Sequence, residues 1–320
     1  MMSTKDNSVL AIVVPCYNES EVFKGCLTEL QYVLNHLSKL RKISSNSYIL
    51  FVDDGSRDDT WQQIKYASRE YHNVRGIKLS CNKGHQIALI AGLKASDADI
   101  TISIDADLQD DTNAIEKMVD EYFLGNEVVY GVRDDRSSDS FFKRNTATIF
   151  YKTMTFLGVK QIEHHADYRL LSRNALESFL KFSERNIYIR GIIPLIGFKS
   201  SQVYYSRKER LAGESKYPLR KMLGLAIDGI TSLSIKPLRI ISVSGLIVSL
   251  SSFVIGCISI FQKIMGQTIE GWASVMVGLF FVGGIQLLCI GIIGEYIGKI
   301  YVEAKQRPLF FIEENTLDEK

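Results

Sequence analysis

The segment ITISIDADLQDD, residues 100–111, joins an apolar run to four carboxylates, those of Asp105, Asp107, Asp110 and Asp111. Mg²⁺ and Mn²⁺ prefer oxygen ligands and are often held by one or two carboxylates that leave positions open for phosphate oxygens. If the strand continues through the motif, Asp105, Asp107 and Gln109 share one side of it. These three residues are predicted metal ligands, whereas Asp110 and Asp111 are expected to cap a helix or face solvent. The alternative is a solvated acidic turn.

A second acidic motif, VDDGSRDDT at residues 52–60, also follows an apolar run. A carboxylate at the end of a strand can accept hydrogen bonds from a base imide or a ribose hydroxyl, and a glycine permits the sharp turn that follows. Asp53 and Asp54 are therefore predicted to bind a nucleotide. Asp58 and Asp59 are expected only to cap the helix that begins near Thr60. The sequence contains neither a GxGxxG after a strand nor a GxxxxGK[ST], which argues against a dinucleotide or P-loop site.

These motifs need a scaffold, and apolar runs of strand length supply it at residues 9–15, 47–54, 74–80, 99–107 and 127–133. The segments between them have apolar residues near helical spacing. This alternation predicts an α/β fold with a parallel-rich sheet and helices on both faces. Ligands of such sheets bind at the carboxyl ends of the strands, which is where the acidic motifs lie.

The 46% hydrophobic content is unevenly distributed, because residues 240–262 and 271–294 carry no charge. Each run exceeds the roughly 20 residues that a bilayer core requires, so both are predicted transmembrane helices. Basic residues flank the outer ends of the pair, and the connecting loop has only Lys263. Both ends are therefore predicted to face the cytoplasm. The expected organisation is a cytoplasmic domain at residues 1–235, a two-helix hairpin at 236–300 and a cytoplasmic tail at 301–320.

Two further segments, residues 145–159 and 218–233, are predicted to lie on the membrane surface as amphipathic helices. Packing against the protein core is the alternative for the first of them. The five cysteines show no CxxC pair or metal-ligand spacing and are expected to be reduced. The net charge of +2 says little by itself, but basic residues near the predicted membrane helices favour contact with anionic lipid headgroups. No nucleic-acid partner is expected.

The motifs VVPCYNE, VDDGSRDDT, NKGHQIALIAGL and DADLQ, in this order, resemble the nucleotide-sugar domain of family 2 glycosyltransferases, which have a GT-A fold. With GVRDDR, DYRLLSR, ERLAGESKY and the two membrane helices, nearly the whole chain resembles the dolichol-phosphate mannose synthase group. Within that group it is most similar to the bacterial polyprenyl-phosphate (bactoprenol) glucosyltransferase branch. Such a signal is strong because several blocks occur together, whereas DDGS or DxD alone would be weak.

The resemblance implies roles for individual residues. The implied catalytic residues are Asp167, close to the sugar, Arg133, near the acceptor phosphate, and Lys216, in a mobile loop over the phosphates. The implied metal ligands are Asp105, Asp107 and Gln109, for Mg²⁺ or Mn²⁺. The implied substrate-binding residues are Pro15, Tyr17, Glu19, Asp53, Asp54, Lys83, His85, Asp105, Arg136, Arg169, Arg207, Arg210 and Ser215. Whether Asp167 is a base or orients a sugar hydroxyl is left open.

The implied reaction is inverting transfer of glucose from UDP-glucose to undecaprenyl phosphate, which gives a lipid-linked sugar for cell-envelope glycan modification. Alternative donors are UDP-4-amino-4-deoxy-arabinose derivatives, UDP-N-acetylhexosamine and GDP-mannose. The implied setting is the bacterial inner membrane, with a homo-oligomer, a downstream flippase and a second glycosyltransferase as partners. A processive polysaccharide synthase is disfavoured because the chain lacks a QxxRW-type motif. A receptor that binds nucleotide sugars without turnover is the alternative from another class.

Overall fold

The computed structural model describes residues 7–134, 165–206, 230–231, 234–266 and 271–316. The chain divides into two compact units. The first contains residues 1–149, 160–217 and 307–320, and the second contains residues 150–159 and 218–306.

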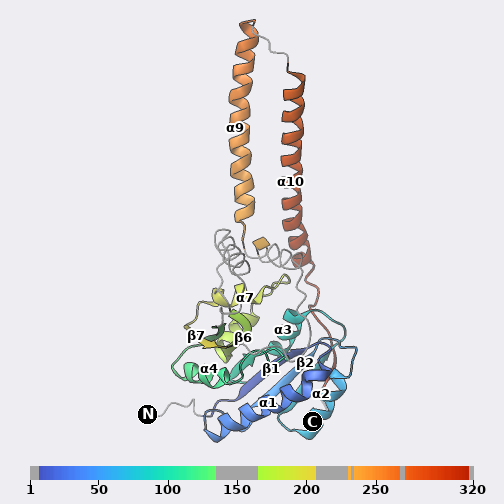
Figure 1. Cartoon of the computed structure of the whole chain (residues 1–320), viewed down its shortest axis with the longest axis vertical. Helices are drawn as coiled ribbons and strands as arrows, with labels where there is room; N and C mark the ends of the chain where they lie inside the picture. Colours follow the sequence, from blue (N-terminus) through green and yellow to red (C-terminus); the bar gives the residue numbers. More distant parts are fainter. Residues whose placement is uncertain (1–6, 135–164, 207–229, 232–233, 267–270, 317–320) are drawn as a thin grey trace. The chain divides into compact units, whose positions relative to one another are not determined.

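An eight-stranded mixed sheet forms the centre of the first unit, in the order β7-β5-β6-β4-β1-β2-β3-β8 (Figure 1). The strands are β1 (Leu10–Cys16), β2 (Tyr48–Asp53), β3 (Val74–Leu79), β4 (Ile100–Ser103), β5 (Val128–Arg133), β6 (His165–Ser172), β7 (Ser200–Tyr205) and β8 (Ile312–Asn315). Neighbours β4, β1, β2 and β3 run parallel, as do β5 and β7. Strand β6 is antiparallel to β4 and β5, and β8 is antiparallel to β3.

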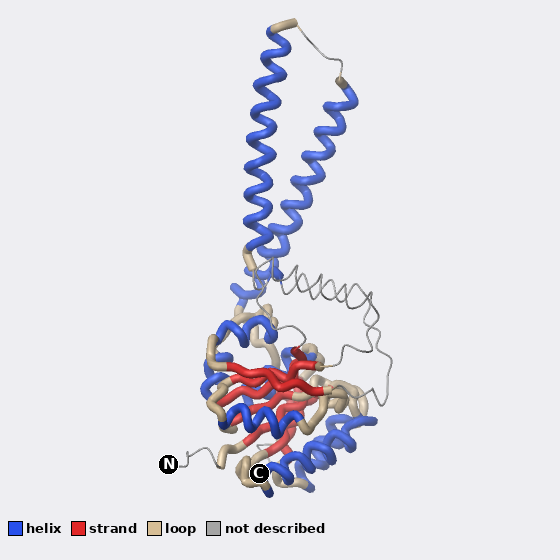
Figure 2. Tube along the Cα trace, turned by 60° about the vertical axis from the view of Figure 1, so that its left-hand side comes forward, coloured by secondary structure: helices blue, strands red, loops and turns tan. Residues whose placement is uncertain are grey.

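Helices cover both faces of this sheet (Figure 2). They are α1 (Ser20–Lys39), α2 (Thr60–Glu70), α3 (His85–Ala95), α4 (Ala114–Phe123), α6 (Arg173–Leu180), α7 (Ile189–Ile192) and the 3-10 helix η1 (Ile193–Ile196). Leu10, Ile12 and Val14 of β1 belong to one core cluster with apolar residues of α1, α2 and α4. The opposite face of β1 packs against α3, where a Cβ on Gly92 would lie 2.4 Å from Val13. The predicted α/β fold with a parallel-rich sheet is confirmed.

Three strands are additional to the prediction, namely β6, β7 and β8. Strand β8 lies in the segment that the sequence assigns to a tail, and it forms the edge of the sheet beside β3. Gly76 N donates to the Thr316 hydroxyl at 2.8 Å, and Lys65 pairs with Glu314 at 2.7 Å. Residues that follow the predicted membrane helices are therefore part of the first unit.

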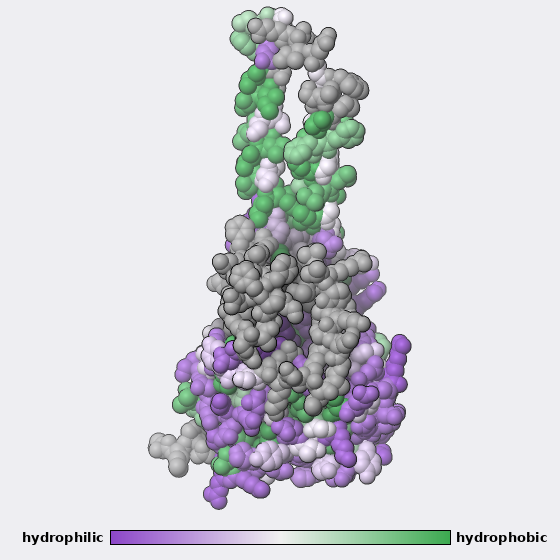
Figure 3. Space-filling view, viewed as in Figure 1, coloured by the Kyte–Doolittle hydropathy of each residue, from purple (hydrophilic) through white to green (hydrophobic). Residues whose placement is uncertain are grey.

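The second unit contains two long helices, α9 (Lys236–Ile264) and α10 (Trp272–Lys305). In their apolar windows, Lys236–Ile255 and Val277–Lys305, every described residue except Tyr296 is exposed or only partly buried. Figure 3 shows hydrophobic side chains along both helices. Because apolar surface of this extent is unfavourable in water, the two helices are candidate membrane spans. The Tyr296 hydroxyl donates to the Ser234 carbonyl at 2.7 Å within this unit.

Candidate active site

The acidic motifs meet because β4, β1 and β2 are parallel neighbours. Cys16 at the end of β1 is in register with Asp53 at the end of β2, and Val13 is in register with Ser103 at the end of β4. The carboxyl ends of these strands therefore lie along the same edge of the sheet. The residues predicted to form the ligand site are thereby brought to one edge.

The turn after β2 is fixed by its own carboxylates. Asp54 accepts hydrogen bonds from the backbone N–H groups of Lys83 at 2.7 Å and Gly84 at 2.9 Å, so it holds the loop before α3. Gly55 has φ +69°, and a Cβ there would lie 2.7 Å from the Asn82 nitrogen. Only glycine fits this close approach of two loops. Both carboxylate oxygens of Asp54 thus have backbone partners, and its predicted contact with nucleotide stays a prediction.

Asp53 differs from its neighbour. It is fully buried, and its Oδ2 accepts from Ser56 N at 3.2 Å. Its Oδ1 has no hydrogen-bond partner in the described part of the chain. Burial raises the pKa of Asp53, although hydrogen bonds from Ser56 oppose the shift. A buried oxygen without a donor is unfavourable, so an N–H from a ligand would stabilise it.

Beside this turn lies the segment after β1. Pro15 is buried within the strand, whereas the Tyr17 side chain is 41% exposed and available to a ligand. The Glu19 carbonyl accepts from the first turn of α1. Asn18, which the sequence analysis did not select, has φ 53° and accepts from Arg57 N at 2.9 Å. Asn18 thus links the ends of β1 and β2. The sequence feature that could have identified it is its residue type, because asparagine tolerates the left-handed region of backbone conformation.

The DADLQ segment does not continue the strand as predicted. Strand β4 ends at Ser103, Leu108 has φ 52°, and Asp107 Oδ1 accepts from Gln109 N at 3.2 Å in a local turn. The alternation argument for three ligands on one side is therefore wrong. Within the described residues, no group of three or more His, Cys, Asp or Glu side chains is arranged to hold a metal ion.

Asp105 and Asp107 still fit a metal ion whose remaining ligands come from the substrate and water. Burial raises the pKa of Asp105, His85 opposes the shift, and the charges of Asp167, Asp110 and Asp107 add to it. Such mutual repulsion would be relieved by a divalent cation. Mg²⁺ is often bound by one or two carboxylates with phosphate oxygens and water as its other ligands. Asp105 and Asp107 suit this arrangement, whereas the Gln109 side chain is only 2% exposed.

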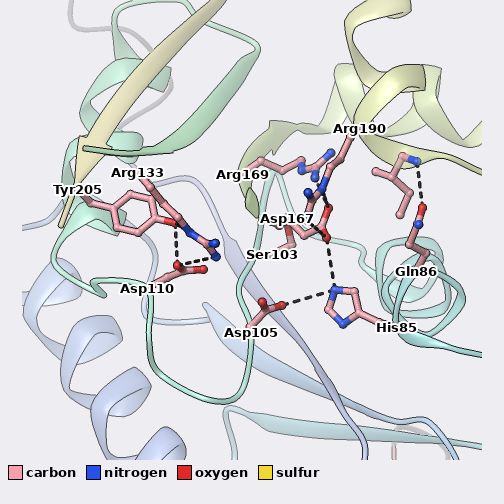
Figure 4. Close-up of polar contacts among 11 residues, drawn as sticks. His85, Gln86, Ser103, Asp105, Asp110, Arg133, Asp167, Arg169, Arg190 and Tyr205 are labelled. Atoms are coloured by element: carbon pink, nitrogen blue, oxygen red, sulfur yellow. Dashed lines mark hydrogen bonds and ion pairs between the residues drawn. The ribbon is translucent and has the colours of Figure 1, made fainter. Parts of the chain in front are cut away.

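Asp167 lies among cations (Figure 4). It comes from β6 and accepts from Arg169 Nη2 at 2.5 Å and from Arg190 Nη2 at 3.0 Å. His85 Nε2, in the first turn of α3, lies 3.6 Å from Asp167 and 3.5 Å from Asp105. Burial alone would raise the pKa of Asp167, but the His85 hydrogen bond and the two arginines hold it well below its usual range. A carboxylate in this state is a poor base at neutral pH.

The two arginines beside Asp167 differ from the sequence analysis in different ways. Arg169 was expected to contact substrate, but its side chain is only 1% exposed and lies behind Asp167, so direct contact is not available in this structure. Arg190 of α7 was not predicted and has a side chain that is 42% exposed. Helix α7 is positioned in part by Gln86, whose Oε1 accepts from Ile189 N at 3.1 Å. The sequence gives little signal for Arg190, because it lies in an otherwise apolar segment far from the acidic motifs.

A third arginine, Arg133, lies at the end of β5, beside Tyr205 at the end of β7 (Figure 4). Arg133 donates from Nη2 to Asp110 Oδ1 at 3.2 Å and from Nε to the Tyr205 hydroxyl at 3.3 Å. Asp110 is 2% exposed, so the expectation that it caps a helix or faces solvent is wrong. Asp111 is partly exposed and its Oδ1 accepts from Asn113 N at 3.2 Å in the turn before α4, but the N-cap of that helix is Asn113, without a side-chain capping bond.

The remaining predicted site residues have less structural support. Lys83 is exposed in the loop before α3. Arg136, Arg207, Arg210, Ser215 and Lys216 lie outside the described residues, as does the segment 145–159.

A mixed α/β sheet with carboxylates at the ends of its parallel strands, together with the sequence motifs, defines a glycosyltransferase domain of the GT-A type. Residues 11–180 match the family described as glycosyl transferase family 2, and the chain belongs to this family. Residues 236–300 match the GtrB C-terminal hairpin. The resemblance drawn from the sequence motifs is thus confirmed.

Relatives match over almost the full length. The chain is 49% identical over 314 residues to the uncharacterized glycosyltransferase YkoT of Bacillus subtilis (strain 168). This match covers 98% of this chain and 93% of that protein. It is 37% identical over 309 residues to the bactoprenol glucosyl transferase of Shigella phage SfV, covering 95% of this chain and 98% of that protein. A prophage bactoprenol glucosyl transferase homolog of Escherichia coli (strain K12) is 36% identical, with coverage of 95% and 98%.

Proposed function

We propose that this enzyme transfers glucose from UDP-glucose to undecaprenyl phosphate with inversion at the anomeric carbon. The observation that carries the proposal is the set of three carboxylates at the strand ends, those of Asp53, Asp105 and Asp107. None of them forms an ion pair with a lysine or arginine in the described part of the chain. A nucleoside diphosphate with a divalent cation would supply what they lack, namely a base N–H and positive charge.

Uridine is supported over guanosine by Asp53. Its Oδ2 already has a backbone donor, so a single oxygen is left for the base. Uracil offers one imide N–H, whereas guanine offers an N–H and an amino group side by side, which suit both oxygens of a carboxylate. The donor is therefore proposed to be a uridine diphosphate sugar. Glucose is proposed from the names of the relatives in Shigella phage SfV and Escherichia coli.

The acceptor is proposed from the same names and from the hairpin. Bactoprenol is a polyprenyl alcohol, and its phosphate lies at a membrane surface. A phosphate acceptor is anionic at neutral pH and needs no strong base, which agrees with the low pKa of Asp167. Asp167 would then orient Arg190 and a sugar hydroxyl instead of removing a proton.

A bound Mg²⁺ or Mn²⁺ would neutralise negative charge on the departing diphosphate. Asp105 and Asp107 are the proposed ligands, with Gln109 as the weaker candidate. Lys216, Arg207, Arg210 and Ser215 are proposed to close over the phosphates. The partner proteins, the homo-oligomer and the glycan product stay predictions.

Purified enzyme in detergent should be incubated with undecaprenyl phosphate and a panel of radiolabelled nucleotide sugars. We expect label in the lipid fraction with UDP-glucose, and much less with UDP-N-acetylglucosamine or GDP-mannose. Proton NMR of the product should show a β-linked sugar phosphate, since the donor is α-linked. Transfer from GDP-mannose in preference to UDP-glucose would contradict the proposed donor. Hydrolysis of UDP-glucose without a lipid product would contradict the proposal that undecaprenyl phosphate is the acceptor.

We further propose that the glycosyltransferase domain faces the cytoplasm of a bacterial cell whose inner membrane the hairpin spans. Single cysteines should be introduced as Gln267→Cys and Ser45→Cys, with Cys81→Ser in both because Cys81 is exposed. We expect an impermeant thiol reagent to label intact cells only in the Gln267→Cys variant. Cys81→Ser alone is the background control, and labelling of Ser45→Cys alone would reverse the orientation.

A further inference from the structure

Arg133 is held by two partners that leave a defined part of its guanidinium open. Asp110 Oδ1 accepts from Arg133 Nη2 at 3.2 Å and from the Tyr205 hydroxyl at 2.7 Å. The same hydroxyl accepts from Arg133 Nε at 3.3 Å. The three side chains therefore form a closed triangle of hydrogen bonds (Figure 4). We call these three residues the arginine triangle.

The donors that remain open form one edge of the guanidinium. Arginine has five N–H donors in a planar fork. Nε and one hydrogen of Nη2 are used in the triangle, which leaves both hydrogens of Nη1 and the second hydrogen of Nη2. One open hydrogen on Nη1 and the open hydrogen on Nη2 point in parallel. The edge that they form matches two oxygens of a phosphate. The Arg133 side chain is 33% exposed, so the edge is accessible.

The two partners are themselves rigid. Asp110 is 2% exposed and Tyr205 is 4% exposed. Arg133 and Tyr205 are register partners at the ends of β5 and β7, and Asp134 N donates to the Tyr205 carbonyl at 3.0 Å. The ring of Tyr205 packs edge-on against Tyr168, with centroids 5.2 Å apart. A long side chain held this way loses little rotamer entropy when it binds a ligand.

Charge alone does not explain the triangle. Asp110 neutralises Arg133, which weakens its attraction for an anion, and the Tyr205 hydroxyl adds no charge. Both partners instead fix the direction in which the guanidinium of Arg133 points.

We propose that Asp110 and Tyr205 are positioning residues that hold the open edge of Arg133 toward a phosphate group of a substrate. The inference rests on the proposed function, which supplies two phosphate-bearing substrates, the nucleotide sugar and the polyprenyl phosphate. Both present the same oxygen chemistry to an arginine. The experiment distinguishes them.

The test is a double-mutant cycle with Tyr205→Phe and Arg133→Ala, in which KM is measured separately for UDP-glucose and for undecaprenyl phosphate. We expect Tyr205→Phe to raise the KM of one substrate by about tenfold, as expected for a lost hydrogen bond to a charged group, with kcat changed less than KM. The substrate whose KM rises carries the phosphate that Arg133 binds. In the Arg133→Ala background, Tyr205→Phe should have no further effect, because the group it positions is absent.

The matched control is Tyr168→Phe. It removes a hydroxyl that donates to the Asp111 carbonyl at 3.1 Å next to the triangle, without touching Arg133. We expect both KM values to stay within about twofold of the parent, because the Tyr168 hydroxyl does not bond to Arg133 and its loss leaves the arginine triangle intact. Asp110→Asn keeps an oxygen acceptor for both donors and should raise the same KM less than Tyr205→Phe does. Equal effects of Tyr205→Phe in the presence and absence of Arg133, or equal effects of Tyr168→Phe, would overturn the proposal.

A binding readout separates this inference from the proposed reaction. UDP and undecaprenyl phosphate should each be added to the detergent-solubilised enzyme, and the rise in unfolding temperature recorded without turnover. Wild-type protein that binds either ligand but transfers no glucose would contradict the proposed function alone. A ligand-induced rise that is unchanged in Tyr205→Phe would overturn the positioning role.

Discussion

Two neighbouring groups of carboxylates in the site have opposite surroundings. On the acidic side, Asp53, Asp105 and Asp107 lie at the ends of β2 and β4 without a described lysine or arginine partner in ion-pair contact. On the arginine side, at the ends of β5 to β7, Asp110 pairs with Arg133, and Asp167 pairs with Arg169 and Arg190.

The difference indicates what each side contributes. Carboxylates that already have guanidinium partners within the fold position those arginines and stabilise the structure. Of the carboxylates without such partners, Asp105 and Asp107 repel each other, and all three are proposed to await a cation or a base N–H from substrate. Loss of an acidic-side residue should therefore reduce turnover without loss of stability, whereas loss of an arginine-side carboxylate should reduce both.

The largest expected effect on turnover is on the acidic side. Asp105→Ala and Asp107→Ala should each lower turnover by about 100-fold or more, because the diphosphate loses electrostatic stabilisation. Their unfolding temperatures without substrate should equal or exceed that of the parent, since like-charge repulsion is relieved. EDTA should abolish transfer, and Mg²⁺ or Mn²⁺ should restore it. Asp111→Ala is the control with near-parent turnover, and a loss of stability in Asp105→Ala or Asp107→Ala would erase the distinction between the two sides.

Asp167→Ala should have the next largest effect on turnover and the largest on stability. It leaves the buried guanidinium of Arg169 without its carboxylate, and breaking a buried ion pair costs about 3 kcal/mol or more. Asp167→Asn retains an oxygen acceptor and should recover part of that stability. The measurement is thermal unfolding in detergent beside the transfer assay. If Asp167→Ala were as stable as the parent, the structural role assigned to this pair would be wrong.

Arg190→Gln should have a moderate effect. Its side chain is 42% exposed, so removal should leave stability nearly unchanged. Turnover should fall by about tenfold, because the exposed charge that Asp167 holds in the site is lost. Arg173→Gln is a matched control, since this arginine is similarly exposed and pairs with Glu177 on α6, outside the site. Equal losses in the two variants would show that Arg190 has no specific role.

The smallest expected effect concerns Asp58, a carboxylate in neither group. It accepts from Thr60 N at 3.0 Å and from Ser20 N at 3.1 Å, and so links the starts of α1 and α2. Burial would raise its pKa, but the hydrogen bonds from Thr60 and Ser20 lower it from 3.8 to about 2. The ionised form is favoured in the folded state, so its stabilisation is complete above the unfolded pKa and is lost as pH falls toward 2.

Asp58→Asn should therefore lower the unfolding temperature slightly at pH 7, by about 1–3 °C. The difference from the parent should shrink as pH falls from 5 to 3. Asp59→Asn is the control, because Asp59 makes no side-chain capping bond. A difference that grows on acidification would have the wrong sign for a lowered pKa.

The sequence predicts those parts of the fold that are encoded locally. Strands β1 to β5 are apolar runs followed by polar motifs, and their positions are predicted within a few residues. Strand β6 was missed because Asp167 and Arg169 interrupt its apolar pattern, and they are buried only because they pair with each other. Strand β8 has the polar sequence IEEN and is a strand because β3 lies beside it.

The same limit applies to the site. Asp53, Asp105 and Asp107 stand in short motifs whose residue types alone make them candidates for binding a metal ion or a nucleotide. Arg190 is 23 residues from Asp167 in the chain, and Tyr205 is 95 residues from Asp110. Their contacts follow from the sheet order, which brings β4, β5, β6 and β7 together, and no local pattern encodes that order.

Strand β8 also sets an order of events during synthesis. Gly76 of β3 and Thr316 are joined by a hydrogen bond although 240 residues separate them, and helices α9 and α10 are translated in between. The edge of β3 must therefore remain unpaired while the ribosome makes the hairpin. An open edge strand is prone to pairing with other chains. Synthesis of the hairpin thus comes before completion of the sheet, and a ribosome that stalls within the hairpin would leave a nascent chain with an aggregation-prone edge.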